Sequence, residues 1–138
     1  MELQVGPFDP ELHVRSRDHY EAVRREIRLL RLQPGEPPVR LEDLAERLAA
    51  QFPSRDVDAV AERAYLAGEP TFVARASIPD HLVTVAIQAC DELAVLLEEL
   101  DDWAHDKQAN LLEAPEDVKR YRAAYLGQAR EQFQAALG

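Results

Sequence analysis

The fold is decided by residues 79–108, which read PDHLVTVAIQACDELAVLLEELDDWAHDKQ. Apolar residues recur here in alternating steps of four and three, which places them along one seam of a helix. The seam comprises Leu82, Ala86, Ala89, Leu93, Leu96, Leu100 and Trp103, and Val83, Cys90 and Leu97 widen it on one side. The opposite face carries Asp91, Glu98, Asp102 and His105. The pattern predicts one long amphipathic helix over about 79–108.

Helix signals divide the rest of the chain into further helices. Asp9 and Pro10 favour the start of a first helix, because Asp caps a helix and proline suits its first turn. The stretch QPGEPP at residues 33–38 ends that helix. A second, short helix is predicted to stop before Pro53, and Ser54 is expected to cap a third. The run TFVARA at residues 71–76 is predicted to be a connector, since no partner strand is evident.

The last helix is predicted to begin at Pro115 and to cover about 115–137. Consecutive long helices joined by a short loop normally pack as an antiparallel pair. The sequence therefore predicts an all-α fold, a compact bundle of about five helices in a single helical domain over residues 1–138. Its long central helix, about 79–108, pairs antiparallel with the C-terminal helix, about 115–137.

Composition narrows the function. The net charge of −10 repels nucleic-acid phosphates, so we expect no nucleic acid as a partner. The first residues lack the basic lead and apolar core of a signal peptide, and the longest uncharged run is about half a membrane span. Cys90 is the only cysteine, which fits a reducing compartment. We therefore expect a cytoplasmic protein with no membrane partner.

The acidic end of the long helix raises a metal-binding alternative. Glu98, Asp102 and His105 are spaced to project from one helical face. Carboxylates and histidines at such spacing ligate metals in helical bundles, although those ligands point inward and come from several helices. These three residues lie opposite the apolar seam, so we expect them to face solvent and to hold no metal. A metal- or small-ligand-binding bundle is kept as the alternative function.

Residues 39–64 offer a lesser alternative, a helix-turn-helix DNA-binding protein. The segment LEDLAERL resembles the first helix of that motif. The candidate recognition helix, however, begins with Asp56 and Asp58, which would face phosphates and the acceptor-rich edges of bases. Two ordinary core helices explain the segment better.

The first helix carries a basic strip on this acidic protein. The arginine ridge, as we call it, comprises Arg17, Arg24, Arg28 and Arg31. Guanidinium groups beside apolar residues suit recognition of a partner's carboxylates. The alternative is that these arginines pair with acids of the same chain or cover the edge of the core with their aliphatic stems. The ridge is the predicted partner-binding site.

Two segments resemble a known family. RDHYEAVRREIRLLRL at residues 17–32 resembles the first helix of a group of small actinobacterial all-helical regulatory proteins. EAPEDVKRYRAAYLGQAREQF at residues 113–133 is similar to that group's last helix, through Tyr121, Tyr125, Leu126 and Gly127. The resemblance implies a regulatory role beside ATP-binding anti-sigma-factor kinase-like proteins in partner-switching stress regulation. It implies no catalytic residues.

Together these observations predict a non-enzymatic module that acts by binding another protein, possessing no catalytic residues and needing no cofactor. Motifs of nucleophilic catalysis and phosphate-binding loops are absent from the sequence. A homodimer is predicted if the apolar seam of the long helix is left uncovered by the chain's own helices.

Overall fold

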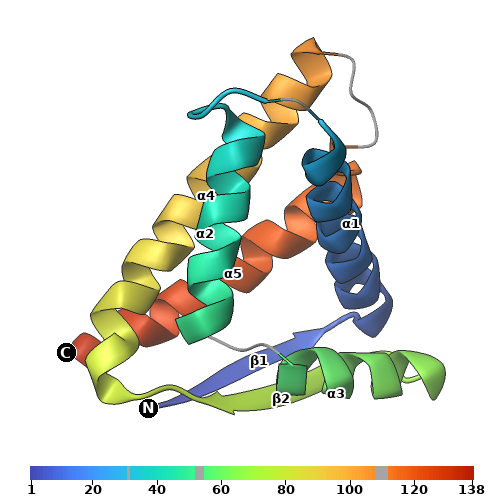
Figure 1. The fold of residues 1–138 in the computed structure, drawn as a ribbon. Helices are drawn as coiled ribbons and strands as arrows, with labels where there is room; N and C mark the ends of the chain where they lie inside the picture. The colour runs from blue at the N-terminus through green and yellow to red at the C-terminus, as the bar shows by residue number, and fades with distance from the viewer. Residues whose placement is uncertain (31, 52–54, 108–111) are drawn as a thin grey trace.

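The structure, a computed structural model, describes residues 1–30, 32–51, 55–107 and 112–138. In chain order these residues form β1 (Glu2–Phe8), α1 (Pro10–Leu29), α2 (Pro37–Gln51), α3 (Arg55–Leu66), β2 (Phe72–Ser77), a 3-10 turn (Asp80–Leu82), α4 (Val83–Asp106) and α5 (Glu116–Leu137). Figure 1 shows a small two-stranded sheet at one end of the molecule, with α3 lying alongside β2 and the other helices rising from the sheet. The predicted all-helical bundle with its long central helix is confirmed, with the sheet as an addition.

The predicted antiparallel pair is formed by α4 and α5, the two longest helices described (Figure 1). Arg130 bonds Asp91 at one end of the pair, and Arg122 bonds Asp101 nearer the other. Residue numbers thus fall along one helix as they rise along the other. The long helix α4 begins later than the predicted start near Pro79, because a 3-10 turn follows Pro79 and α4 starts only at Val83. The predicted last residue, Gln108, lies outside the described residues.

The chain covers most of the apolar seam by itself. Ala86, Leu96 and Leu100 are buried, and the other members of the seam are half-buried. The helices α2 and α5 pack against α4 and cover this side. Val95, off the seam, is 52% exposed. The acidic face is exposed, as predicted. The uncovered seam that motivated the predicted homodimer is therefore small.

Local signals set the ends of the remaining helices. The Asp9 carboxylate accepts a bond from the Glu11 N–H at 2.9 Å and so caps α1 as predicted. Gly68, with φ of 71°, follows α3 and lets the Glu69 N–H donate back to the Ala64 carbonyl at 2.9 Å. The predicted cap Ser54 lies outside the described residues.

The prediction that residues 71–76 form a connector is wrong. Residues 72–76 lie in β2, which pairs antiparallel with β1, and Val5 lies opposite Ala74. The partner strand is separated from β2 by three helices, so no local hairpin signal marks it. The pairing is irregular between Val5 and Phe8. Gly6 lies in that interval with φ of 102°, and a Cβ there would collide with the Phe72 carbonyl oxygen, so only glycine fits.

The buried core has two clusters. One joins the inner face of the sheet to α3, the start of α4 and the end of α5, through residues such as Val5, Ala61 and Phe133. The other joins α1, α2 and the second half of α4, through Val23, Leu41 and Leu100. Within the described ranges, no helix is both long and apolar enough to cross a membrane.

Candidate functional site

The arginine ridge does not stay together in the fold. Arg17 lies beside Asp18 at 3.3 Å and Glu62 of α3 at 3.6 Å. Arg24 and Arg28 remain neighbours on the second half of α1, whereas Arg31 lies outside the described residues. The first half of the ridge therefore contacts α3, and in the second half Arg24 and Arg28 lie together.

Glu42 of α2 organises this second half. Its carboxylate accepts two bonds from Arg24, at 2.9 and 3.1 Å, and one from Arg28 at 3.2 Å. Hydrogen bonding from Arg24, with a smaller contribution from Arg28, holds the pKa of the Glu42 carboxyl below its usual range against the opposing effect of burial. Arg24 is thus part of the α1–α2 contact, while Arg28, with 61% of its side chain exposed, also faces solvent.

A hollow of about 200 Å³ opens on α1 at this point, and we call it the basic hollow. It is lined by Glu21, Arg24, Arg25 and Arg28. Arg25 is exposed and forms no ion pair within the described part of the chain. Sequence analysis did not single out Arg25, although it follows Arg24 directly and lies one turn before Leu29.

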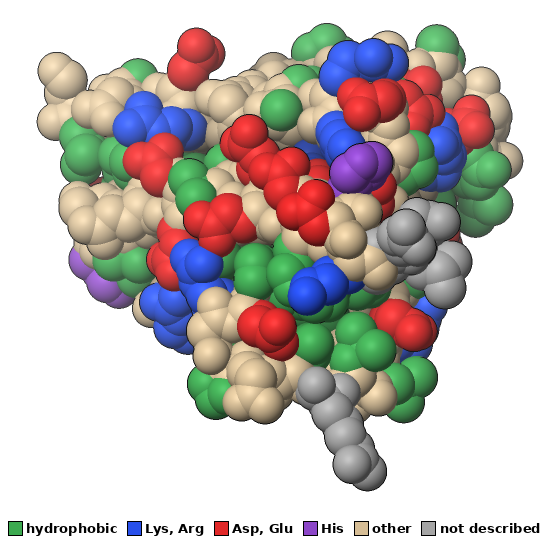
Figure 2. Space-filling view, turned by 90° about the horizontal axis from the view of Figure 1, so that it is seen from above, with side chains coloured by type: hydrophobic (Ala, Val, Ile, Leu, Met, Phe, Trp, Pro, Cys, Tyr) green, Lys and Arg blue, Asp and Glu red, His purple; other side chains and the backbone are tan. Residues whose placement is uncertain are grey.

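Leu29 adds an apolar element beside the basic hollow. It is 78% exposed at the end of α1, four residues after Arg25 and so on the same side of the helix. Figure 2 shows the end of the molecule seen from above, where basic side chains lie among acidic ones and hydrophobic side chains show between them. The basic hollow can therefore offer guanidinium groups and an apolar contact to the same ligand.

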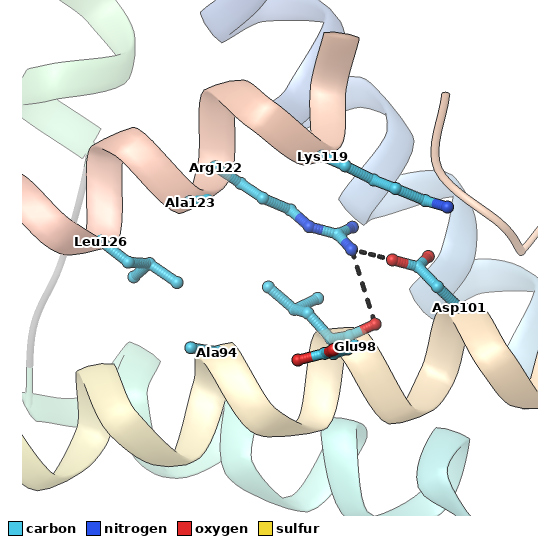
Figure 3. A pocket seen from close by; sticks show the side chains of 8 residues that line it. Ala94, Glu98, Asp101, Lys119, Arg122, Ala123 and Leu126 are labelled. Carbon is cyan, nitrogen blue, oxygen red and sulfur yellow. Dashed lines mark hydrogen bonds and ion pairs between the residues drawn. The ribbon is translucent and has the colours of Figure 1, made fainter. Parts of the chain in front are cut away.

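A second opening lies between α4 and α5. This α4–α5 cleft has a volume of about 250 Å³ and is lined by Ala94, Leu97, Glu98, Asp101, Lys119, Arg122, Ala123 and Leu126. In Figure 3, Arg122 reaches from α5 toward Asp101 on α4, while Ala94 and Leu126 lie at the apolar end. Two acids and two bases balance in charge, so the cleft favours neither anions nor cations.

The charged end of this cleft is a buried structural contact. Asp101 has 7% of its side chain exposed, accepts a bond from Arg122 and accepts another from the Ala114 N–H at 3.1 Å. Arg122 also donates to the Leu97 carbonyl at 3.5 Å. Sequence reasoning missed Asp101, because it flanks the acidic face and looks like another solvated carboxylate.

The three residues of the metal alternative remain on the surface. Glu98 and Asp102 are exposed, and His105 lies 3.4 Å from Glu113, with 77% of its side chain exposed. Among the residues that the structure describes, no group of three or more His, Cys, Asp or Glu side chains could hold a metal ion.

The helices of the DNA-binding alternative pack in different places. The helix α2 lies against α4, whereas α3 lies against α1 and β2. Asp58, in the first turn of α3, is bonded to His13 instead of being free to face a ligand.

His13 forms a buried polar chain that the sequence did not reveal. Its Nε2 lies 2.7 Å from Asp58 of α3 and its Nδ1 lies 2.6 Å from the Tyr121 hydroxyl of α5. The rings of Phe8, Phe72 and Tyr125 surround the imidazole and the Tyr121 phenol. Burial raises the pKa of Tyr125 to about 12. The chain of His13, Asp58 and Tyr121 is a junction that joins α1, α3 and α5.

Comparison with protein-family models, with curated proteins and with solved structures found no match for this chain. The resemblance of residues 17–32 and 113–133 to small regulatory proteins therefore stays a prediction.

Proposed function

We propose that this chain is a non-enzymatic regulatory module that binds an acidic segment of a partner protein at the basic hollow of α1. The observation that carries the proposal is the meeting of Arg24, Arg25 and Arg28 with a single acid, Glu21, in one hollow on a chain of net charge −10. An acidic segment is repelled by most of this surface, so a local basic surface decides where it can bind.

The chemistry of the basic hollow suits carboxylates next to an apolar side chain. Glu42 holds Arg24 and Arg28 in place, which reduces the entropy that they would lose on binding. Arg25 has no such partner in the described chain, and its guanidinium can take a carboxylate in the two-bond geometry. Leu29, exposed on the same side, can pack against an apolar residue of the ligand.

The kind of partner follows from the resemblance given above. An ATP-binding anti-sigma-factor kinase-like protein of a partner-switching system is the first candidate, with this chain as a cytoplasmic regulator. The small-ligand alternative rests on the α4–α5 cleft. Its volume of about 250 Å³ falls below the roughly 300–1,000 Å³ typical of small-molecule sites. The metal alternative has no described cluster to support it.

The test is capture of partners from an extract of the native host by the tagged full chain, read by mass spectrometry. Arg25→Glu should reduce the amount of partner captured, because it reverses the charge of the one arginine of the basic hollow that the described chain leaves unpaired. Arg24→Glu is a poorer choice, since it would also break the contact with Glu42 and weaken the fold.

Arg120→Glu is the matched control. Arg120 is exposed on α5, and no ion pair is recorded for it in the described residues. The two variants therefore carry the same net charge and differ only in where it changes. Capture that Arg25→Glu leaves intact would contradict the proposal.

A further inference from the structure

The two edges of the sheet are treated differently. On β1, the backbone groups of Gln4 and Gly6 face away from β2 and meet the side chains of α5. Gln132 accepts from the Gln4 N–H at 2.8 Å and donates to the Gln4 carbonyl at 2.7 Å. Gln128 does the same for Gly6, at 2.9 Å in both directions. Two glutamines one helical turn apart thus close this edge.

The outer edge of β2 has no hydrogen-bonding partner in the described part of the chain, although α3 packs against this strand. Met1 and Ile78 exchange backbone bonds, so the alternation of an antiparallel pair points Ala74 and Ala76 toward β1. The backbone groups of Val73 and Arg75 then point outward. Among the described residues they have no recorded hydrogen-bond partner. Figure 1 shows β2 on the side of β1 that faces away from α5.

The side chains along this edge are complementary to themselves. Val73 is 45% exposed, Arg75 has 63% of its side chain exposed, and Glu69 is exposed just before β2. When two antiparallel copies of the edge are aligned with Val73 opposite Val73, each Arg75 lies opposite Thr71 of the other copy. Glu69 precedes Pro70 and lies outside β2, beyond the end of the paired residues. The Arg75 guanidinium, which lies 3.9 Å from Glu2 of its own chain, would approach Glu69 of the other copy only at that end.

We propose that two copies of this chain dimerise by antiparallel pairing of their β2 edges about Val73, forming a continuous four-stranded sheet. The pairing satisfies the outward backbone groups, matches two apolar side chains at the centre and places Arg75 near Glu69 twice. Pro70 and Pro79 flank the strand and lack N–H donors, so the backbone pairing is confined to residues 71–78 and the Arg75–Glu69 approach is a contact of side chains at its end. This inference does not depend on the partner proposed for α1.

Cysteine cross-linking tests the pairing and its register together. Residues in a hydrogen-bonded antiparallel pair have Cα atoms about 5.5 Å apart, within the range of a disulfide. Val73→Cys should therefore form a covalent dimer under mild oxidation. Arg75→Cys should not, because the two copies of residue 75 would lie about 13 Å apart along the sheet. Equal cross-linking of both variants, or none of either, would overturn the proposal.

Sedimentation of the full chain supplies a second measurement without a new thiol. The native chain should show a concentration-dependent monomer–dimer equilibrium, and Val73→Pro should weaken it at least tenfold, because proline removes an outward N–H that the monomer does not use. Glu69→Arg should also weaken it, and Glu69→Arg with Arg75→Glu should restore it. A native chain that stays monomeric up to millimolar concentration would overturn the proposal, as would a double variant no tighter than Glu69→Arg alone.

Discussion

The side-chain amide of Gln132 bonds the backbone of Gln4 in both directions, at 2.8 and 2.7 Å, across 128 positions of sequence. Gln128 repeats the arrangement one turn earlier on Gly6. A helix thereby acts as the missing neighbour of an edge strand and ties the two ends of the chain together. The N-terminal strand is held by these amides as well as by β2.

Gln128→Ala should lower the free energy of unfolding by about 1–3 kcal/mol, because it leaves the buried Gly6 N–H without a partner and leaves the Gly6 carbonyl only the long bond, 3.5 Å, from Gln4 Nε2. Urea denaturation measures the change. Gln134→Ala is the control on the same helix, since Gln134 is exposed and no hydrogen bond is recorded for its side chain in the described residues. Equal losses in both variants would argue against the edge-closing role.

Asp101→Ala should be much more damaging than Asp102→Ala. Asp101 is buried against Arg122 and also accepts from the Ala114 N–H, so its loss leaves a cation with little water around it. Breaking a buried ion pair in this way typically costs about 3–5 kcal/mol. Asp102 is exposed, and its loss should change stability by less than about 0.5 kcal/mol. Thermal and urea unfolding of the two variants decide the comparison.

His19 should make the protein less stable as the pH falls below neutrality. Burial, with a smaller contribution from the positive charge of Arg122, lowers the pKa of the His19 imidazole, and its Nε2 is buried without a partner in the described residues. As the pH falls, the His19 imidazole of the unfolded chain therefore binds a proton near pH 6.5, whereas that of the folded chain stays unprotonated. The contribution of neutral His19 to the free energy of unfolding is fully present above that pH and is lost as the pH falls toward the lowered pKa of the folded state.

His19→Gln should flatten this part of the curve. The free energy of unfolding, measured from pH 8 to pH 5.5, should fall less in the variant than in the native chain. His81→Gln is the control, because His81 is exposed. Parallel curves for the native chain and His19→Gln would show that His19 does not couple protonation to folding.

Cys90 should react slowly with thiol reagents in the folded protein. Burial, and to a lesser extent the nearby Asp91 carboxylate, raises the pKa of the Cys90 thiol to about 11. At pH 8 only about one molecule in a thousand then carries the reactive thiolate. Labelling should be slow in buffer and rapid in denaturant. Rapid labelling in buffer would show that α4 and α5 separate readily at this point.

The sequence predicts the helical part of this fold well because the signals there are local. The steps of four and three from Leu82 to Trp103 identify α4, and Asp9 with Pro10 marks the start of α1. The sheet could not be predicted from such local signals. Its strands lie far apart in sequence, and glutamine side chains close one edge of β1 in place of a third strand.

The candidate site could be predicted only in part. Arginines 24 and 28 follow from the helical spacing, but the role of Glu42 in holding them depends on how α2 packs on α1. Asp101 and Asp102 are adjacent acids with opposite environments, and only packing against α5 distinguishes them. The residues of the junction, His13, Asp58 and Tyr121, lie on three different helices, so no regular spacing in the sequence links them.

Binding of a partner's acidic segment at the basic hollow can be measured with purified proteins. Calorimetric titration of the full chain with a purified ATP-binding anti-sigma-factor kinase-like protein from the same host, at about 50 and 300 mM salt, tests it most directly. We expect binding that weakens with salt, and a dissociation constant about three- to tenfold higher for Arg25→Glu than for Arg120→Glu. Binding that is equal in the two variants and insensitive to salt would contradict the proposal.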